Sequence, residues 1–289
     1  MYSKKIKLNN GVEIPVLGLG TWLMSKEEAY LSCLAALEMG YRHIDTAVAY
    51  GNEEAVGRAI RDSKLPREEI FVTTKVPAEA KSEKAARKEI EGSFKKLGLD
   101  YIDLVIIHCP QPWILFRKFQ RRYDKANVEV YKVLEEYYRA GKIKAIGVSN
   151  FLPADLDNIL NNCEVVPAVN QILAHVKNMD FETINYCREK GIIVEAYSPL
   201  GHGNSKVLKD EAIKEIANKY NVSVPQLCLR FTVELNMVTL PKSTNIAHMK
   251  SNGDLDFNIS EEDMERLVKL DKIKDYGKDD WYPVFSKGK

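Results

Sequence analysis

The chain has 289 residues, of which 45% are hydrophobic and 29% are charged, a balance typical of globular proteins that excludes a disordered or collagen-like chain. The 42 basic and 41 acidic side chains leave a formal net charge of +1, so no nucleic acid or acidic membrane partner is expected. The apolar runs are far shorter than the roughly 20 residues that span a bilayer, and the lysine-containing N-terminus lacks the apolar core of a secretory signal. Five scattered cysteines without a CxxC pair favour free thiols, so a cytoplasmic protein is predicted.

The first expected element is a β-hairpin over residues 8–14, where Asn10-Gly11 is a turn signal between alternating side chains. We expect this hairpin to close the bottom of the fold. Eight short apolar runs follow, and each is typical of a buried parallel strand. They end near Leu19, Ile44, Thr74, Ile107, Val148, Asn170, Ala196 and Leu240.

Amphipathic helices are predicted between these runs. The first begins at a capping box formed by Ser25 and Glu28, and another apolar stripe covers residues 86–97. Four of the predicted helices end at a glycine shortly before the next strand, and glycine readily adopts the left-handed backbone conformation that ends a helix. These glycines are Gly40, Gly98, Gly141 and Gly191. Such repeated joints indicate parallel strands connected by right-handed crossovers.

Eight strand–helix units predict a single (β/α)8 TIM-barrel domain over residues 1–289. The alternative, a doubly wound open sheet, usually carries GxGxxG after its first strand, and residues 18–23 begin that pattern without completing it. The C-terminal tail after Asp271 contains Trp281, Tyr282 and Phe285, and we expect it to fold back near the barrel mouth.

Polar residues occur where the apolar runs end, and in a barrel these ends meet at one mouth. Asp45 and Tyr50 follow the second run, Lys75 the third and His108 the fourth. Each alone could be a helix cap, a packed aromatic ring, a solvated strand end or a core histidine, but their gathering at one mouth favours function. A nearby ammonium lowers the pKa of a tyrosine hydroxyl. Tyr50, tuned by Lys75 and Asp45, could then give a proton to an oxygen that His108 positions.

The sequence contains no metal-ligand cluster and no nucleophilic serine motif, so we expect a cofactor to supply the electron pair. Tyr197 could stack on a flat ring, while Ser149, Asn150 and Gln171 could bind an amide. These residues together suit a nicotinamide.

The sequence resembles the aldo-keto reductases over essentially its whole length. The motifs that match in order are GLGTW (18–22), HIDTAVAYGNE (43–53), KIKAIGVSNF (142–151), AYSPLG (196–201) and LPKS (240–243) followed by Asn252. The resemblance implies metal-free reduction of aldehydes or ketones with NADPH, or NADH in some members, by a protein that is usually a monomer. It implies that Asp45, Tyr50, Lys75 and His108 form the catalytic tetrad, with Tyr50 as the general acid.

The resemblance also implies a set of cofactor-binding positions. Ser149, Asn150 and Gln171 would hold the carboxamide and Tyr197 would stack on the nicotinamide. The pyrophosphate and adenosine end would be lined by Ser198, Leu200, Lys242, Ser243, His248 and Asn252.

Three positions depart from the family pattern. Cys109 replaces the usual tryptophan after the catalytic histidine, which we expect to widen the substrate pocket. His248 replaces the arginine that contacts the 2′-phosphate, which weakens the preference for NADPH that Lys242 and Ser243 still favour. Ser251 replaces a frequent glutamate beside Asn252.

The loop 109–127 is aromatic and basic. One interpretation is a lid whose aromatic side chains pack on the barrel. The other is a substrate pocket lined by Trp22, Ala49, Cys109 and Trp113, with basic residues that attract acidic substrates.

Two other functions remain open at this point. Lys75 could form a Schiff base, as in a lyase, although its pairing with Asp45 favours a charged ammonium. The chain could also be a non-catalytic subunit or sensor that binds a nicotinamide nucleotide.

Overall fold

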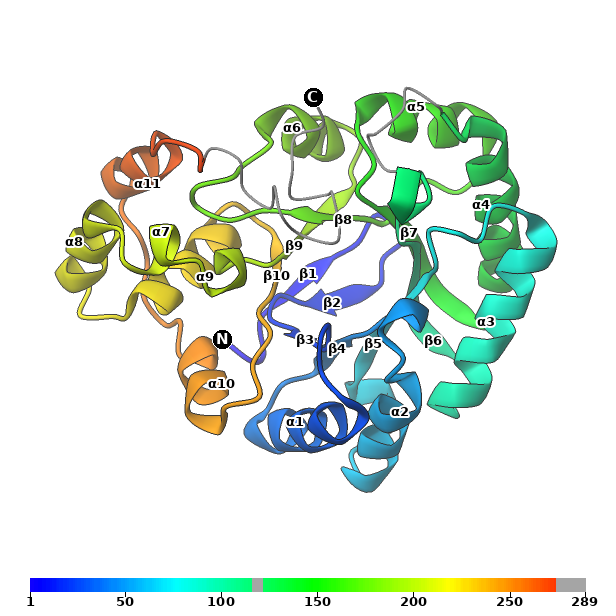
Figure 1. The fold of residues 1–289 in the computed structure, drawn as a ribbon, viewed down its shortest axis with the longest axis horizontal. Helices are drawn as coiled ribbons and strands as arrows, with labels where there is room; N and C mark the ends of the chain where they lie inside the picture. Colours follow the sequence, from blue (N-terminus) through cyan, green and yellow to red (C-terminus); the bar gives the residue numbers. More distant parts are fainter. Residues whose placement is uncertain (116–121, 274–289) are drawn as a thin grey trace.

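The computed structural model describes residues 1–115 and 122–273. The predicted return of the C-terminal tail to the mouth concerns mainly residues 274–289, which lie outside this range. Within it, eight parallel strands pair in chain order as one sheet (Figure 1). They are β3 (Leu19–Gly20), β4 (His43–Asp45), β5 (Phe71–Val76), β6 (Ile102–Ile107), β7 (Ile143–Ser149), β8 (Val169–Leu173), β9 (Ile193–Tyr197) and β10 (Val238–Leu240).

The sheet closes on itself beside its first and last strands. Leu17 forms a parallel bridge with Thr239, and the Gly18 amide donates to the Thr239 carbonyl oxygen at 3.0 Å. The predicted (β/α)8 barrel is therefore confirmed. The strand ends differ by a few residues from the predicted ones, so Lys75 and Gln171 lie inside β5 and β8 rather than after them.

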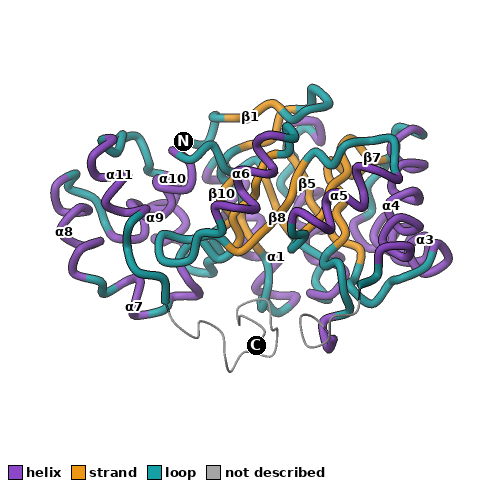
Figure 2. The backbone as a smooth tube through the Cα atoms, turned by 90° about the horizontal axis from the view of Figure 1, so that it is seen from above, coloured by secondary structure: helices purple, strands orange, loops and turns teal. Residues whose placement is uncertain are grey.

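The predicted hairpin is present but longer than residues 8–14. Strand β1 (Lys5–Lys7) pairs antiparallel with β2 (Glu13–Pro15), and residues 8–12 form the connection. The hairpin lies across one end of the barrel (Figure 2). Leu8 and Ile14 pack there against inward-facing apolar side chains such as Phe71 and Val238, which makes this end a plug.

Helices surround the barrel (Figure 1). They are α1 (Lys26–Met39), α2 (Glu53–Asp62), α3 (Glu83–Leu97), α4 (Asp124–Arg139), α5 (Pro153–Asn162), α6 (Phe181–Glu189), α7 (Ser205–Leu208), α8 (Glu211–Lys219), α9 (Val224–Glu234), α10 (Ile246–Gly253) and α11 (Glu261–Val268). Short 3-10 turns are η1 (Val48–Tyr50), η2 (Arg67–Glu69), η3 (Trp113–Leu115) and η4 (Gly201–Gly203). Among these described helices, none combines the length and apolar composition needed to cross a membrane.

The helix-end signals in the sequence are confirmed. At the start of α1, the Glu28 amide donates to Ser25 Oγ at 3.2 Å and the Ser25 amide donates to Glu28 Oε2 at 2.8 Å. At its end Gly40 has a φ of 107°, a left-handed conformation that glycine adopts without steric cost.

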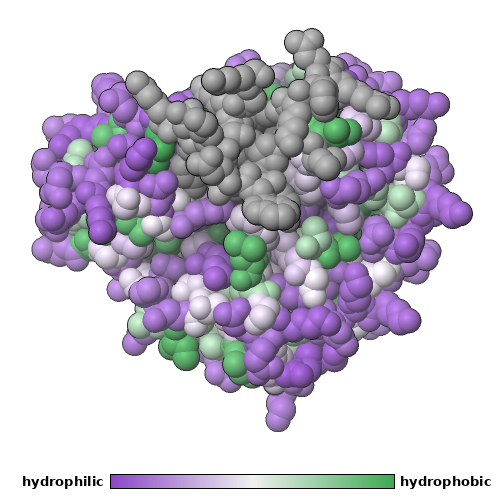
Figure 3. All heavy atoms as spheres, viewed as in Figure 1, coloured by the Kyte–Doolittle hydropathy of each residue, from purple (hydrophilic) through white to green (hydrophobic). Residues whose placement is uncertain are grey.

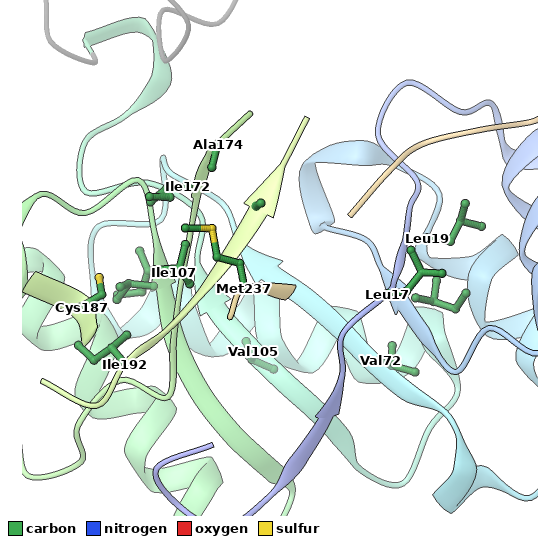
Figure 4. Close-up of a cluster of buried hydrophobic side chains, with 14 of the residues drawn as sticks. Leu17, Leu19, Val72, Val105, Ile107, Ile172, Ala174, Cys187, Ile192 and Met237 are labelled. Carbon is green, nitrogen blue, oxygen red and sulfur yellow. The ribbon is translucent and has the colours of Figure 1, made fainter. Parts of the chain in front are cut away.

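The main core lies between the barrel and its helices. Figure 4 shows part of this layer, including Val72, Val105 and Ile107 from the strands and Cys187 from α6. On the face seen in Figure 3, hydrophilic side chains cover most of the visible surface, and hydrophobic ones form small separate groups among them.

Gly57 allows α2 to approach α3 closely. A Cβ at Gly57 would lie 2.1 Å from the backbone oxygen of Leu97, so we expect Gly57→Ala to lower the free energy of unfolding by about 1–3 kcal/mol. Gly92→Ala on α3 is the matched control, since nothing lies within 4 Å of its added Cβ, and it should stabilise by about 0.5–1 kcal/mol. Urea unfolding measures both, and equal effects of the two substitutions would contradict this account.

Candidate active site

The side chains inside the barrel are apolar at the bottom and polar near the mouth. Apolar side chains and the hairpin fill the bottom. Because side chains alternate along a strand, residues two apart on β4, β5 and β9 stack upward in pairs. These pairs are His43 and Asp45, Thr73 and Lys75, and Glu195 and Tyr197. A polar layer therefore lies beneath the mouth.

Lys75 and Asp45 form a buried ion pair in this upper part. Lys75 is fully buried, and its Nζ donates to the two Asp45 carboxylate oxygens at 2.6 and 2.7 Å and to the Thr46 carbonyl oxygen at 3.0 Å. Three acceptors thus match the three protons of an ammonium. This arrangement holds a fixed positive charge beneath the mouth.

Tyr50 and His108 lie next to that charge. The Lys75 Nζ is 4.9 Å from the centre of the Tyr50 ring, and the rings of Tyr50 and His108 meet edge to face with centroids 5.6 Å apart. Burial, and secondarily the charge of Lys75, hold the pKa of His108 well below its usual range. His108 is therefore a neutral imidazole that can donate one hydrogen bond without carrying charge.

The predicted amide-binding residues form a connected group beside His108. Asn150 Nδ2 donates to the His108 carbonyl oxygen at 3.1 Å and to Ser149 Oγ at 3.0 Å, and the Tyr197 hydroxyl donates to Asn150 Oδ1 at 2.8 Å. Asn150 has a φ of 62° at the end of β7, an uncommon conformation that often occurs at functional sites. Gln171 joins the group to the ion pair, because its Nε2 donates to Asp45 Oδ2 at 2.8 Å.

One cavity of about 740 Å³ connects this group to the end of β10. Asp45, Tyr50 and His108 line it, while Lys75 lies behind them. The predicted cofactor residues along its wall are Ser149, Asn150, Gln171, Tyr197, Ser198, Leu200, Lys242, Ser243, His248 and Asn252. Trp22, Ala49 and Trp113 line it as well, as does Ser251.

Cys109 is not brought into this cavity as the sequence predicted. It is fully buried and packs with Ala78 and Trp113. The adjoining backbone is held by Lys81, whose Nζ donates to the Cys109 carbonyl oxygen at 2.8 Å and to Asn127 Oδ1 at 2.9 Å. Trp113 is among the residues that line the cavity and Cys109 is not.

Several residues near the site were missed from the sequence. The ring of His202 lies 4.9 Å from that of Trp22, and both residues line the cavity with Leu23. Glu195 lies deeper, fully buried, and accepts a hydrogen bond from Gln171 Nε2 at 2.9 Å. A signal was present for Glu195, since it is an acidic residue inside the apolar run 191–199.

Comparisons with known proteins identify the family of this chain. Residues 16–272 match the sequence model of the Aldo/keto reductase family, so the chain belongs to the aldo-keto reductase family and is an oxidoreductase. The aldehyde reductase YPR1 of Saccharomyces cerevisiae is 41% identical over 290 residues, covering 94% of this chain and 92% of that protein. The glyoxal reductase of Bacillus subtilis is 40% identical, covering 94% of each chain.

Solved structures show the same fold. The crystal structure of an aldo/keto reductase from Brucella melitensis superposes with a TM-score of 0.86 at 39% identity, covering 93% of this chain and 99% of that chain. The resemblance read from the motifs is therefore confirmed at the level of family and fold.

Proposed function

We propose that the protein reduces small aldehydes or ketones to alcohols with NADPH, using Tyr50 as the general acid. The observation that carries this proposal is the meeting of Tyr50, His108 and the Lys75–Asp45 pair at one end of a single cavity. Relatives named aldehyde reductase and glyoxal reductase support the same class of substrate.

The residues that line the cavity support a nicotinamide nucleotide as the bound cofactor. Asn150 and Gln171 offer amide groups whose orientation is already fixed by hydrogen bonds. Lys242 is exposed at the other end and supplies positive charge for phosphate. When bound, the reduced nicotinamide supplies the hydride.

The residues of this chain supply the proton and orient the carbonyl group. His108, as a neutral donor, fixes the carbonyl oxygen next to the Tyr50 hydroxyl. The charge of Lys75 stabilises the negative charge that develops on that oxygen and on Tyr50 as the proton moves. Asp45 holds Lys75 in place, and the buried position of the pair keeps its field strong.

The geometry disfavours the two alternatives raised by the sequence. A Schiff base requires a neutral amine at Lys75, whereas its Nζ is surrounded by three oxygen acceptors within 3.0 Å. A purely nucleotide-binding role does not require the arrangement of Asp45, Tyr50, Lys75 and His108. The first test is the loss of reduced-nicotinamide absorbance with NADPH and then NADH on a panel of aldehydes and ketones. Tight NADPH binding without turnover would support the binding-subunit alternative.

His248 is expected to reduce discrimination for the 2′-phosphate of NADPH. It is exposed in the first turn of α10 and lines the cavity. His248→Arg should raise the ratio of kcat/KM for NADPH over NADH about tenfold, because a guanidinium makes stronger charge-assisted bonds to phosphate. Lys250→Arg on the same helix, outside the residues found to line the cavity, should leave the ratio unchanged. An unchanged ratio in His248→Arg would show that this residue does not contact the 2′-phosphate.

A further inference from the structure

We propose that Glu195 is a positioning residue of this site, which as a neutral carboxylic acid holds the Gln171 amide against Asp45 and which weakens carbonyl reduction when it ionises. This proposal rests on the reductase function proposed above. Glu195 lies on β9, two residues before Tyr197 and one layer below the tetrad.

The surroundings of Glu195 do little to stabilise a negative charge on its side chain. Its side chain is fully buried, and Oε2 accepts one hydrogen bond, from Gln171 Nε2 at 2.9 Å. Oε1 has no hydrogen-bond partner among the described residues. An ionised carboxylate that is fully buried and accepts a hydrogen bond from a single donor is costly, so the site favours the protonated acid.

The amide of Gln171 joins Glu195 to the ion pair. Its Nε2 carries two protons, and they match the bonds to Glu195 Oε2 at 2.9 Å and to Asp45 Oδ2 at 2.8 Å. The amide NH2 therefore points into the barrel between two carboxyl groups. Gln171 cannot turn without breaking one of these bonds, which fixes the orientation of an amide that lines the cavity.

The ionisable groups that face Glu195 come from the opposite strands. From β4 come His43 and Asp45, and from β5 comes Lys75. The neighbouring strands β8 and β10, Val169–Leu173 and Val238–Leu240, contain no ionisable residue.

His43 does not neutralise a charge on Glu195. Its Nε2 is 3.8 Å from Glu195 Oε1 and instead lies 2.9 Å from Thr73 Oγ1. Burial, and then the charge of Lys75, lower the pKa of His43 to about 3, so it is uncharged at neutral and alkaline pH. Burial and the nearby Asp45 charge together raise the pKa of Glu195 to about 8.

Ionisation of Glu195 changes the field at the reacting oxygen. Below pH 8 the acid is neutral and the Lys75–Asp45 pair alone sets the field. Above pH 8 a second negative charge lies beneath the pair and opposes the negative charge that develops on the carbonyl oxygen. We expect kcat for reduction to fall about three- to tenfold on this ionisation.

The test compares the dependence of kcat on pH in the wild type and in Glu195→Gln. The substitution keeps an acceptor for Gln171 and removes the titrating proton. In the wild type, the midpoint of the alkaline limb should lie near the pKa of about 8. In Glu195→Gln it should move up by about one unit or more. Superimposable profiles would overturn the proposal.

Glu53→Gln is the matched control. Glu53 is also buried, at 1% exposure, but it lies on α2 and bonds to Thr74 Oγ1 at 2.7 Å and to Lys96 Nζ at 3.2 Å. The pH profile of Glu53→Gln should match that of the wild type. If both substitutions shift the midpoint equally, the effect is structural and the role assigned to Glu195 is wrong.

Infrared spectra test whether the Glu195 carboxyl group is protonated, and they do so without an activity measurement. The wild type should show the C=O stretch of a protonated carboxylic acid at neutral pH, and this band should vanish as the pH rises through about 8. The band should be absent from Glu195→Gln and present in Glu53→Gln. If no carbonyl compound is reduced, the proposed function fails, and the spectra alone then decide whether Glu195 carries this proton. A band that persists in Glu195→Gln would overturn the assignment.

Discussion

Tyr50→Phe should lower kcat for carbonyl reduction by about 10³-fold, because removal of a positioned general acid typically costs two to four orders of magnitude. The ring, which meets His108 edge to face at 5.6 Å, is retained in phenylalanine. The dissociation constant for NADPH should therefore change by no more than about twofold. Initial rates and fluorescence titration of the nucleotide measure the two quantities separately.

Tyr30→Phe is a suitable control for this substitution. Tyr30 lies on α1, and its hydroxyl donates to Asp62 Oδ2 at 2.9 Å on the outer surface. Its loss should leave kcat unchanged. If Tyr50→Phe also leaves turnover intact, another group donates the proton and the proposed mechanism is wrong.

Lys75→Met should have the largest effect on stability. It removes the ammonium and leaves Asp45 buried, at 4% exposure, without its cation. Breaking a buried pair from one side typically costs about 3–5 kcal/mol. We expect chemical denaturation to show a loss of this size, together with a loss of activity similar to that in Tyr50→Phe.

A double variant separates these two effects. In Lys75→Met/Asp45→Leu no unpaired charge remains, so most of the lost stability should return. Activity should not return, because the charge beside Tyr50 is still absent. Recovery of turnover in the double variant would mean that Lys75 contributes to activity only by stabilising the folded protein.

The barrel itself could be predicted because its signals are local. A capping box, a left-handed glycine and an apolar run each act within a few residues. The helix ends at Ser25 and Gly40 were found where the sequence indicated, and the strands within a few residues of their predicted ends. The meeting of three of the predicted site residues could be predicted for a related reason. Parallel strands in a barrel bring their carboxyl ends to one mouth, so Asp45, Tyr50 and His108 had to line one cavity once the strands were assigned.

Contacts across the barrel could not be predicted in this way. Gln171 bonds to Asp45 from 126 residues away, and nothing local in either segment marks that pairing. The burial of Cys109 against Ala78 and Trp113 likewise depends on where Lys81 and Asn127 hold the chain after His108.

The sequence by itself determined the order of the strands and helices, the family and the four residues expected to carry the chemistry. Only the tertiary structure decided how the barrel closes at Leu17 and Thr239, which side chains line the cavity, and that Glu195 lies beneath the ion pair. The physical reason is that side-chain alternation selects a face of a strand, but the partner met on that face depends on the closure and stagger of all eight strands.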